Sequence, residues 1–154
     1  MAAPVTLQDA ESDLQTAQLE ADPYRQGQYA RAAADAAAEV AMRDDVNAAD
    51  RARALAVMRS SLALIPKSLL GEAHHALAAA RSESDPQRRR ELAKSALAKA
   101  REAVTHPEVT DDERAQARQV IGGGRMIANT IVETAMRQRA AERVQEQQAP
   151  SIAL

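Results

Sequence analysis

The chain has no cysteine, tryptophan or phenylalanine, and its only aromatic side chains are two tyrosines. Without cysteine there is no disulfide, no thiolate metal ligand and no thiol redox chemistry. Without phenylalanine and tryptophan there is little to form the aromatic platform on which single-stranded nucleic acids stack. The composition therefore excludes disulfide-stapled and cysteine-dependent proteins, and it argues against base-stacking nucleic-acid binders.

Large aliphatic side chains are also scarce. Hydrophobic residues make up 45% of the 154 residues, but 37 of these 70 are alanine, and leucine, isoleucine and valine together number 26. Alanine is the best helix former and buries little surface, so we expect helices that pack closely through small side chains. A core this thin favours a chain supported by copies of itself or by partners.

No apolar run approaches the roughly 20 residues that a membrane-spanning helix needs, and the N-terminus lacks the basic and apolar regions of a signal peptide. The net charge of −2 supplies no strong self-repulsion, so an ordered chain is expected despite the small number of large aliphatic residues. We interpret the chain as cytoplasmic, or as part of an assembly made in the cytoplasm, with no membrane partner.

The sequence does contain an internal repeat at an offset of 63 residues. Between residues 7–58 and 70–121, seventeen of 52 aligned positions are identical, where this composition would give roughly five by chance. Ten of the seventeen are not alanine, so low complexity does not explain them. The repeat predicts two copies of a three-helix unit, over residues 6–63 and 68–121.

Capping residues locate the predicted helices. Ser, Thr, Asp and Asn side chains accept hydrogen bonds from the free N–H groups of a first turn, and proline suits the first helical position. We expect Pro66 to end the third helix, because proline disrupts a helix interior. The expected N-caps are Thr6, Asp22 and Asn47 in the first copy and Ser68, Asp85 and Thr110 in the second.

A seventh helix is predicted outside the repeat, over residues 125–144. Three glycines at 122–124 precede it, and we expect them to end the sixth helix and act as a hinge. The predicted fold class is all-α: a tandem duplication of a three-helix unit plus a C-terminal capping helix, as an α-solenoid or bundle. We expect one helical domain over residues 1–149 and a flexible tail over 150–154.

The seventh helix and the tail supply candidate partner-binding residues. A wide apolar band on the helix is able to contact two neighbours or to cap the array. In the tail, Ile152 and Leu154 are candidates for docking into a groove on a neighbouring chain; an ordinary frayed terminus is the alternative, which the general behaviour of termini favours. The band consists of Ile127, Ile131, Val132 and Met136.

The densest basic cluster is Arg88, Arg89 and Arg90. It lies in the first turn of a predicted helix, where the helix dipole disfavours cations, so we expect a reason for its presence. Phosphates or an acidic partner would suit it. Because the chain is acidic overall and poor in aromatic residues, we interpret the cluster as a solvated or partner-facing surface and not as a nucleic-acid site.

Glu72 and His75 are the candidate metal ligands. Their i, i+3 spacing is that of carboxylate-bridged di-metal helix bundles, where two such motifs converge. Only one is present here, since Glu102 and His106 are four residues apart. No nucleophile, base and orienting residue form a recognisable motif, so we expect no enzyme activity, no cofactor and no metal. A metal-binding or enzymatic helix bundle remains an alternative.

Two segments, Gly27–Ala32 and Ala54–Pro66, have small, bulky and small residues in the order found in the second helix of a tetratricopeptide repeat. The chain resembles that family there. The offset of 63 is not a multiple of the family's period of about 34 residues, and its first-helix Trp-Leu-Gly-Tyr pattern is absent. The resemblance implies stacked α-hairpins with a partner-binding face, and it assigns no binding residues.

Taken together, these features predict a non-catalytic helical adaptor or structural protein of bacterial or phage type. Its partner would be another protein or a further copy of the chain, as a homo-oligomer or an assembly subunit. The alternative structural hypothesis is a component of a large assembly, such as a phage particle or a secretion machine.

Overall fold

The computed structural model of the chain describes residues 3–148, and within this range it contains five helices and no strand. The predicted all-α class is therefore confirmed, whereas the predicted number of seven helices is wrong. The helices are α1 (Leu7–Leu19), α2 (Pro23–Ala41), α3 (Ala48–Ser82), α4 (Pro86–Thr105) and α5 (Asp111–Gln148).

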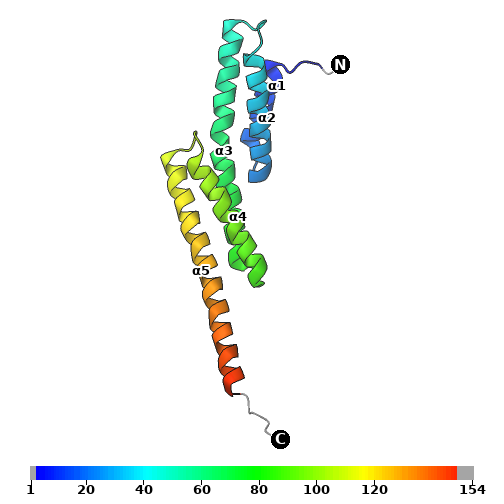
Figure 1. Cartoon of the computed structure of the whole chain (residues 1–154). Coiled ribbons are helices and arrows are strands. Elements are labelled where there is room, and N and C mark those ends of the chain that lie inside the picture. The colour runs from blue at the N-terminus through cyan, green and yellow to red at the C-terminus, as the bar shows by residue number, and fades with distance from the viewer. Residues whose placement is uncertain (1–2, 149–154) are drawn as a thin grey trace.

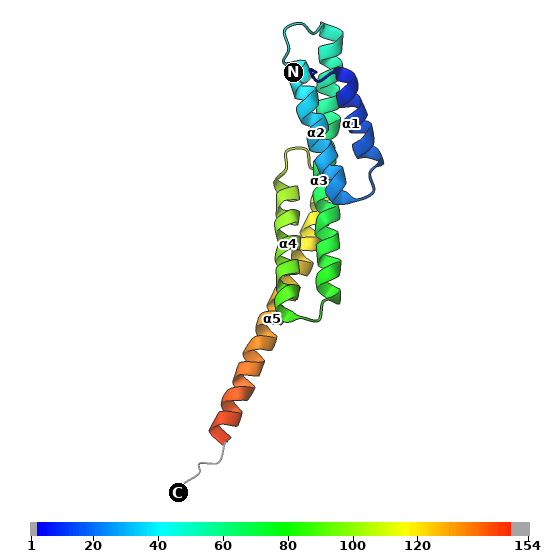
Figure 2. The same cartoon turned by 90° about the vertical axis from the view of Figure 1, so that its right-hand side faces the viewer.

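The helices form two bundles that share α3. We call α1, α2 and the first half of α3 the amino-terminal unit, and the second half of α3, α4 and the first half of α5 the carboxy-terminal unit. Figures 1 and 2 show that the two units are displaced along the long axis of a rod. Within the described range, α3 packs against all four other helices, whereas α1 and α2 pack against neither α4 nor α5. The long helix α3 therefore holds the two units together.

The third and fourth predicted helices are one helix of 35 residues, so the predictions that Pro66 ends a helix and that Ser68 caps one are wrong. An interior proline costs a helix about 3 kcal/mol. Here the Pro66 ring is fully buried, and the helices of both units hold α3 on either side of it. The Ser68 hydroxyl donates a hydrogen bond to the Pro23 carbonyl of α2 instead of capping α3. Tertiary packing thus overrides the local signal.

The glycines at 122–124 lie inside α5, which runs unbroken for 38 residues, so the predicted helix stop and hinge are wrong. A Cβ atom added to Gly124 would come within 2.9 Å of the Leu97 Cγ in α4. Glycine lowers helix stability by up to about 1 kcal/mol relative to alanine. Close approach of α5 to α4 requires the missing side chain, and the resulting contact keeps the helix intact.

The other predicted N-caps are confirmed. Thr6 and Asp9 form a reciprocal capping box, with the Asp9 N–H donating to the Thr6 hydroxyl over 3.1 Å and the Thr6 N–H donating to the Asp9 carboxylate over 2.9 Å. The same kind of exchange joins Thr110 and Glu113. The side chains that accept from the N–H three residues ahead at the remaining helix starts are Asp22, Asn47 and Asp85.

The core consists mainly of alanine, as the composition predicts. The largest fully buried side chains among the described residues are Leu69, Val120, Pro66 and Ser61. Many alanines 63 positions apart have the same environment in the two units. The pairs in which both members are 0% exposed are Ala10 and Ala73, Ala17 and Ala80, Ala30 and Ala93, Ala33 and Ala96, Ala37 and Ala100, and Ala54 and Ala117.

Small residues also let α2 approach α3. A Cβ atom at Gly71 would lie 2.5 Å from the Pro23 Cβ, so the start of α2 rests directly on the backbone of α3. By length and composition alone α3 would suit a membrane-spanning helix, and 44% of its apolar stretch is buried inside the protein. Contact with every other helix accounts for much of this apolar character.

Candidate protein-docking surface

The last part of α5 extends beyond the rest of the protein. From Val132 to Gln148 every residue is exposed except Ala135, which is half-buried. We call residues 132–148 the overhang. Its 17 residues correspond to a length of about 25 Å at 1.5 Å per residue. Figures 1 and 2 both show the overhang projecting from one end of the rod, with no other helix beside its tip.

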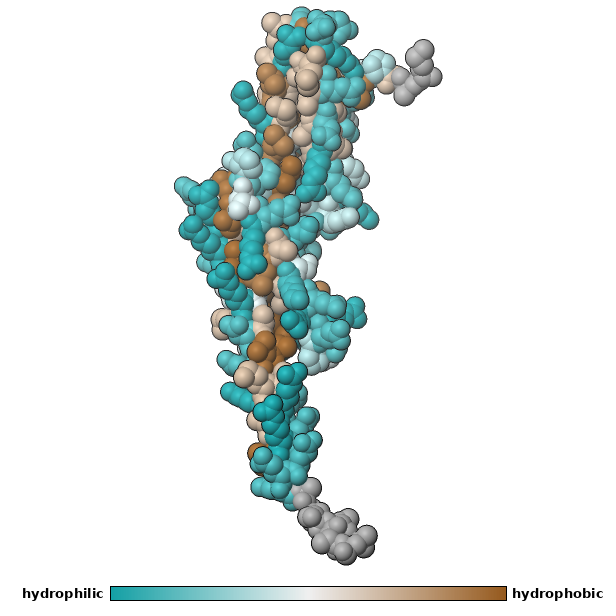
Figure 3. All heavy atoms as spheres, in the orientation of Figure 1, coloured by the Kyte–Doolittle hydropathy of each residue, from teal (hydrophilic) through white to brown (hydrophobic). Residues whose placement is uncertain are grey.

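The overhang carries a row of apolar residues at intervals of four, which places them along one side of the helix. Of these, Val132, Met136 and Val144 are 52%, 64% and 49% exposed, and Ala140 completes the row. Figure 3 shows apolar side chains gathered where α5 leaves the carboxy-terminal unit, with mostly hydrophilic residues farther along that face. An apolar row on a helix that nothing else in the described chain covers is a candidate contact surface.

The structure divides the predicted apolar band into two faces. Ile127 is only 7% exposed and belongs to the hydrophobic core, and Ile131 is half-buried against that core. Val132 and Met136 lie about 100–180° around the helix from these two residues and face solvent. Of the four predicted partner-binding residues on this helix, Ile127 is therefore unavailable in this conformation, whereas Val132 and Met136 are accessible.

The three arginines at the start of α4 lie in different environments. The Arg88 guanidinium is exposed and lies 3.8 Å from the half-buried Glu83 carboxylate, and Arg90 is exposed. Arg89 is half-buried, and its Nε is buried without a hydrogen-bond partner among the described residues. A buried donor without a partner costs about 1–3 kcal/mol, so Arg89 is the member of the cluster that would gain most from an acceptor.

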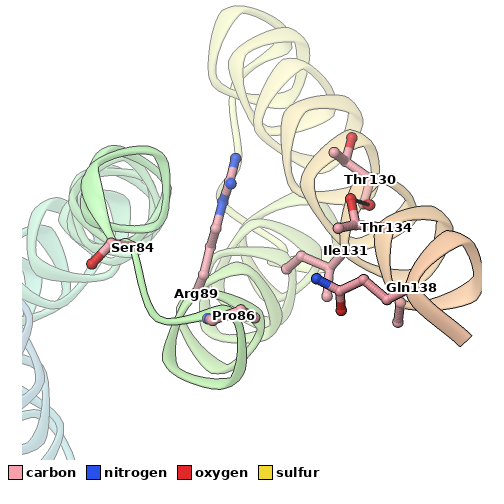
Figure 4. Close-up of a pocket in the computed structure, with 8 residues that line it drawn as sticks. Ser84, Pro86, Arg89, Thr130, Ile131, Thr134 and Gln138 are labelled. Carbon is pink, nitrogen blue, oxygen red and sulfur yellow. Dashed lines mark hydrogen bonds between the residues drawn. The ribbon is translucent and has the colours of Figure 1, made fainter. Parts of the chain in front are cut away.

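Arg89 lines a groove of about 140 Å³ between the start of α4 and α5, which we call the Arg89 groove. Figure 4 shows Ile131 and Gln138 pointing from α5 toward α4, with Arg89 extending between the helices. The sequence analysis did not predict a site at Thr130, Thr134 and Gln138, the polar residues of α5 in this groove. Their spacing of four residues is the signal that places them on one side of the helix. Its lining residues are Ser84, Pro86, Arg89, Thr130, Ile131, Thr134, Ala135 and Gln138.

Glu72 and His75, the candidate metal ligands, lie in a different pocket at the meeting of the two units. The Glu72 carboxylate is paired with the Lys99 ammonium of α4 at 3.4 Å, so a cationic side chain neutralises it. Within residues 3–148, no group of three or more His, Asp or Glu side chains is arranged to hold a metal ion. This junction pocket, of about 270 Å³, is lined by Asp22, Pro23, Tyr24, Glu72, His75, Ser95 and Lys99.

The second potential pair, Glu102 and His106, lies at the end of α4. The His106 Nδ1 accepts a hydrogen bond from the Glu108 N–H over 3.1 Å, which gives the ring a local role in the loop between α4 and α5. The tail residues Ile152 and Leu154 lie outside the described residues.

Comparison with known proteins gives no match to any family model, and no curated protein or solved structure is significantly similar to the chain. The resemblance to tetratricopeptide repeats therefore stays a prediction. The functional proposal therefore rests on the geometry of the overhang and the Arg89 groove.

Proposed function

We propose that the chain is a non-catalytic helical protein that mediates protein-protein contact, as an adaptor or as a structural subunit. The observation that carries this proposal is the exposed apolar row of the overhang, in which Val132 and Met136 are more than half exposed. Each exposed aliphatic side chain would gain roughly 1.5–3 kcal/mol if fully buried, so a protein that covers the row would bind through it.

The shape of the molecule supports the same interpretation. A rod built from alanine contacts between helices holds its surfaces at fixed positions, and the pockets described among residues 3–148 lie at its surface. The grooves on its surface are shallow, as is usual for contacts between proteins, and the overhang extends the rod by about 25 Å. A projecting helix is a common form of contact in helix-in-groove recognition.

We further propose that the two units arose by duplication and that they stack as in an α-solenoid. The support comes from six pairs of buried alanines 63 apart and from the caps that recur at this offset, Asp22 with Asp85 and Asn47 with Thr110. Glu20 and Glu83, for example, each accept a hydrogen bond from the backbone N–H two residues ahead, just before the proline that starts α2 or α4. Repetition of such a local detail is expected of copies of one unit.

The test removes the apolar row without disturbing the fold. The variant Val132→Ser/Met136→Ser/Val144→Ser should keep its helical circular dichroism, because all three side chains are exposed. We expect the native chain to self-associate in light scattering across a concentration series, or to capture a protein from native lysate, and the variant to lose that contact. A native chain that stays monomeric and captures the same proteins as the variant would overturn the proposal.

A further inference from the structure

The Arg89 groove lies where the corresponding part of the amino-terminal unit is closely packed. There, the Ser68 hydroxyl donates a hydrogen bond to the Pro23 carbonyl, and a Cβ atom at Gly71 would lie 2.5 Å from the Pro23 Cβ. In the carboxy-terminal unit the larger residues Ile131 and Thr134 stand at these two positions, and both line the groove. The groove is therefore a feature of one unit, and the helical arrangement that the two units share does not require it.

Arg89 stands where the amino-terminal unit has a neutral side chain with a hydrogen-bond partner. That side chain is Gln26, which is 6% exposed and whose Nε2 donates to the Ala17 carbonyl oxygen over 3.2 Å. Arg89 brings a permanent positive charge to the same place, and its buried Nε has no partner among the described residues. The neighbouring Arg88 pairs with Glu83, whereas no described carboxylate pairs with Arg89. Because buried polar groups almost always have a partner, an acceptor from outside the described chain would complete this site.

The lining of the groove selects an anion. Arg89 is the one charged residue among the eight that line it, so no lining carboxylate balances its charge. Helix α4 begins at the groove with Pro86, and the positive end of its dipole also favours an anion. The Thr130 and Thr134 hydroxyls each donate to a backbone carbonyl over 2.8 Å. The side-chain donors that face each other across the groove are therefore the Arg89 guanidinium and the Gln138 amide, which points from α5 toward α4 (Figure 4).

The size of the groove selects a small molecule. Its volume is about 140 Å³, below the roughly 300 Å³ at which pockets for drug-sized ligands begin. It follows α5 only from Thr130 to Gln138, a length of about 12 Å at 1.5 Å per residue. A standard protein interface needs about 800 Å² on each partner, which a groove of this length does not provide by itself. Pro86, Ile131 and Ala135 give it an apolar wall, so the ligand needs a hydrocarbon part as well as its charge.

We propose that the Arg89 groove binds a small aliphatic monocarboxylate. The carboxylate accepts hydrogen bonds from the Arg89 guanidinium, which suits bidentate pairing, and from the Gln138 amide. The hydrocarbon part lies on Pro86, Ile131 and Ala135. This site goes beyond the proposed protein contact and is independent of it, because the apolar row of the overhang lies on the opposite side of α5.

A titration followed by nuclear magnetic resonance tests the proposal. The ¹⁵N-labelled full chain is titrated with 4-methylpentanoate at constant ionic strength. We expect saturable shifts of the backbone amide signals of residues 130–138 and of Arg89, with a Kd on the order of 1 mM, as suits a ligand of few atoms. The neutral analogue 4-methylpentanamide has the same shape and should bind at least tenfold more weakly, because it lacks the charge that pairs with Arg89.

Two arginine variants show whether the charge acts at this one position. Arg89→Gln introduces the residue that the amino-terminal unit has at position 26, so it should keep its helical circular dichroism and lose binding at least tenfold. Arg90→Gln removes the same charge from an exposed neighbour and should bind 4-methylpentanoate as the native chain does. Equal losses in the two variants would show general attraction to a basic surface, and they would overturn the assignment to the groove.

The remaining outcomes also decide the proposal. Equal binding of the carboxylate and the amide, tighter binding of inorganic phosphate than of 4-methylpentanoate, or no saturable shift at tens of millimolar would each overturn it. The variant Val132→Ser/Met136→Ser/Val144→Ser should bind 4-methylpentanoate as the native chain does. A chain that loses its protein contact in this variant but never binds the carboxylate would overturn the inference and leave the proposed function standing.

Discussion

The second halves of α3 and α5 correspond in sequence position, but one is buried and the other is exposed to solvent. Each continues a helix out of one three-helix unit. The second half of α3 is covered by α4 and α5, so that Leu69 is 1% exposed, whereas the corresponding Val132 of α5 is 52% exposed. Ala73 is fully buried, and the corresponding Met136 is 64% exposed. The difference shows that a continuing helix becomes core only where later helices return along it, and surface where the described chain has none.

The sizes of the side chains agree with this difference between the second half of α3 and the overhang. Ala73 and Ala80 of α3 are fully buried, and side chains this small let helix axes approach closely. The overhang has Met136 and Arg143 where α3 has Ala73 and Ala80. A partner on the overhang therefore cannot pack as closely as α4 packs on α3. It must meet longer side chains, among them three arginines and three glutamates, as a surface contact does.

The largest expected effect is the difference in stability between truncating Leu69 of α3 and truncating the corresponding Val132 of α5. Leu69→Ala should lower the free energy of unfolding by about 2–5 kcal/mol, because it leaves a cavity in the core. Val132→Ala should change it by less than about 0.5 kcal/mol in the monomer, because an exposed side chain loses little. Urea denaturation at low protein concentration measures both. Equal losses in the two variants would mean that the overhang face is already covered in the monomer.

A second pair compares glycines in the two long helices. Gly71→Ala should destabilise the protein by about 1–3 kcal/mol, because its Cβ atom would lie 2.5 Å from the Pro23 Cβ. Gly122→Ala has nothing within 4 Å of the new atom and should stabilise α5 by up to about 1 kcal/mol through helix propensity. Thermal unfolding of both variants checks the sign. A Gly71→Ala protein as stable as Gly122→Ala would show that α2 does not rest on α3 as described.

The smallest effect concerns the start of α1. Hydrogen bonds from the Thr6 backbone N–H, and then from its side chain, hold the pKa of the Asp9 carboxyl below its ordinary value of 3.8. A carboxyl whose pKa is lower in the folded state stabilises that state above its unfolded pKa, and this contribution is lost as the pH falls through the folded pKa. The contribution of Asp9 is therefore complete above about pH 5 and disappears in stronger acid.

The variant Asp9→Asn isolates this effect, because it removes the titrating group. The native protein should unfold at a higher temperature than the variant near neutral pH, and the gap should close as the pH falls below 3.8 and through the lowered pKa of the folded state. The capping box of Thr110 and Glu113 has the same hydrogen bonds in the carboxy-terminal unit, so its loss can be compared with the loss of the Asp9 carboxylate. A gap that stays constant from neutral to acid pH would mean that ionisation of Asp9 does not contribute.

Local signals in the sequence predicted most of the helix starts correctly. The N-caps at Thr6, Asp22, Asn47 and Asp85 are confirmed, because a capping hydrogen bond depends only on residues within one turn. The residues of the candidate docking surface were predicted only in part. Val132 and Met136 are exposed as a partner surface requires, but Ile127 is buried, since which side of a helix faces a neighbour depends on where that neighbour lies.

The sequence by itself determined the helical class, the alanine-based core and the correspondence of positions 63 apart, because propensity, capping and periodicity act along the chain. Only the tertiary structure decided that Pro66 and the glycines at 122–124 lie inside unbroken helices. It also decided that Arg89 lies in a groove that no described helix closes. The physical reason is the same in each case: contacts with helices distant in sequence outweigh a local preference of a few kcal/mol, and no pattern within one turn records them.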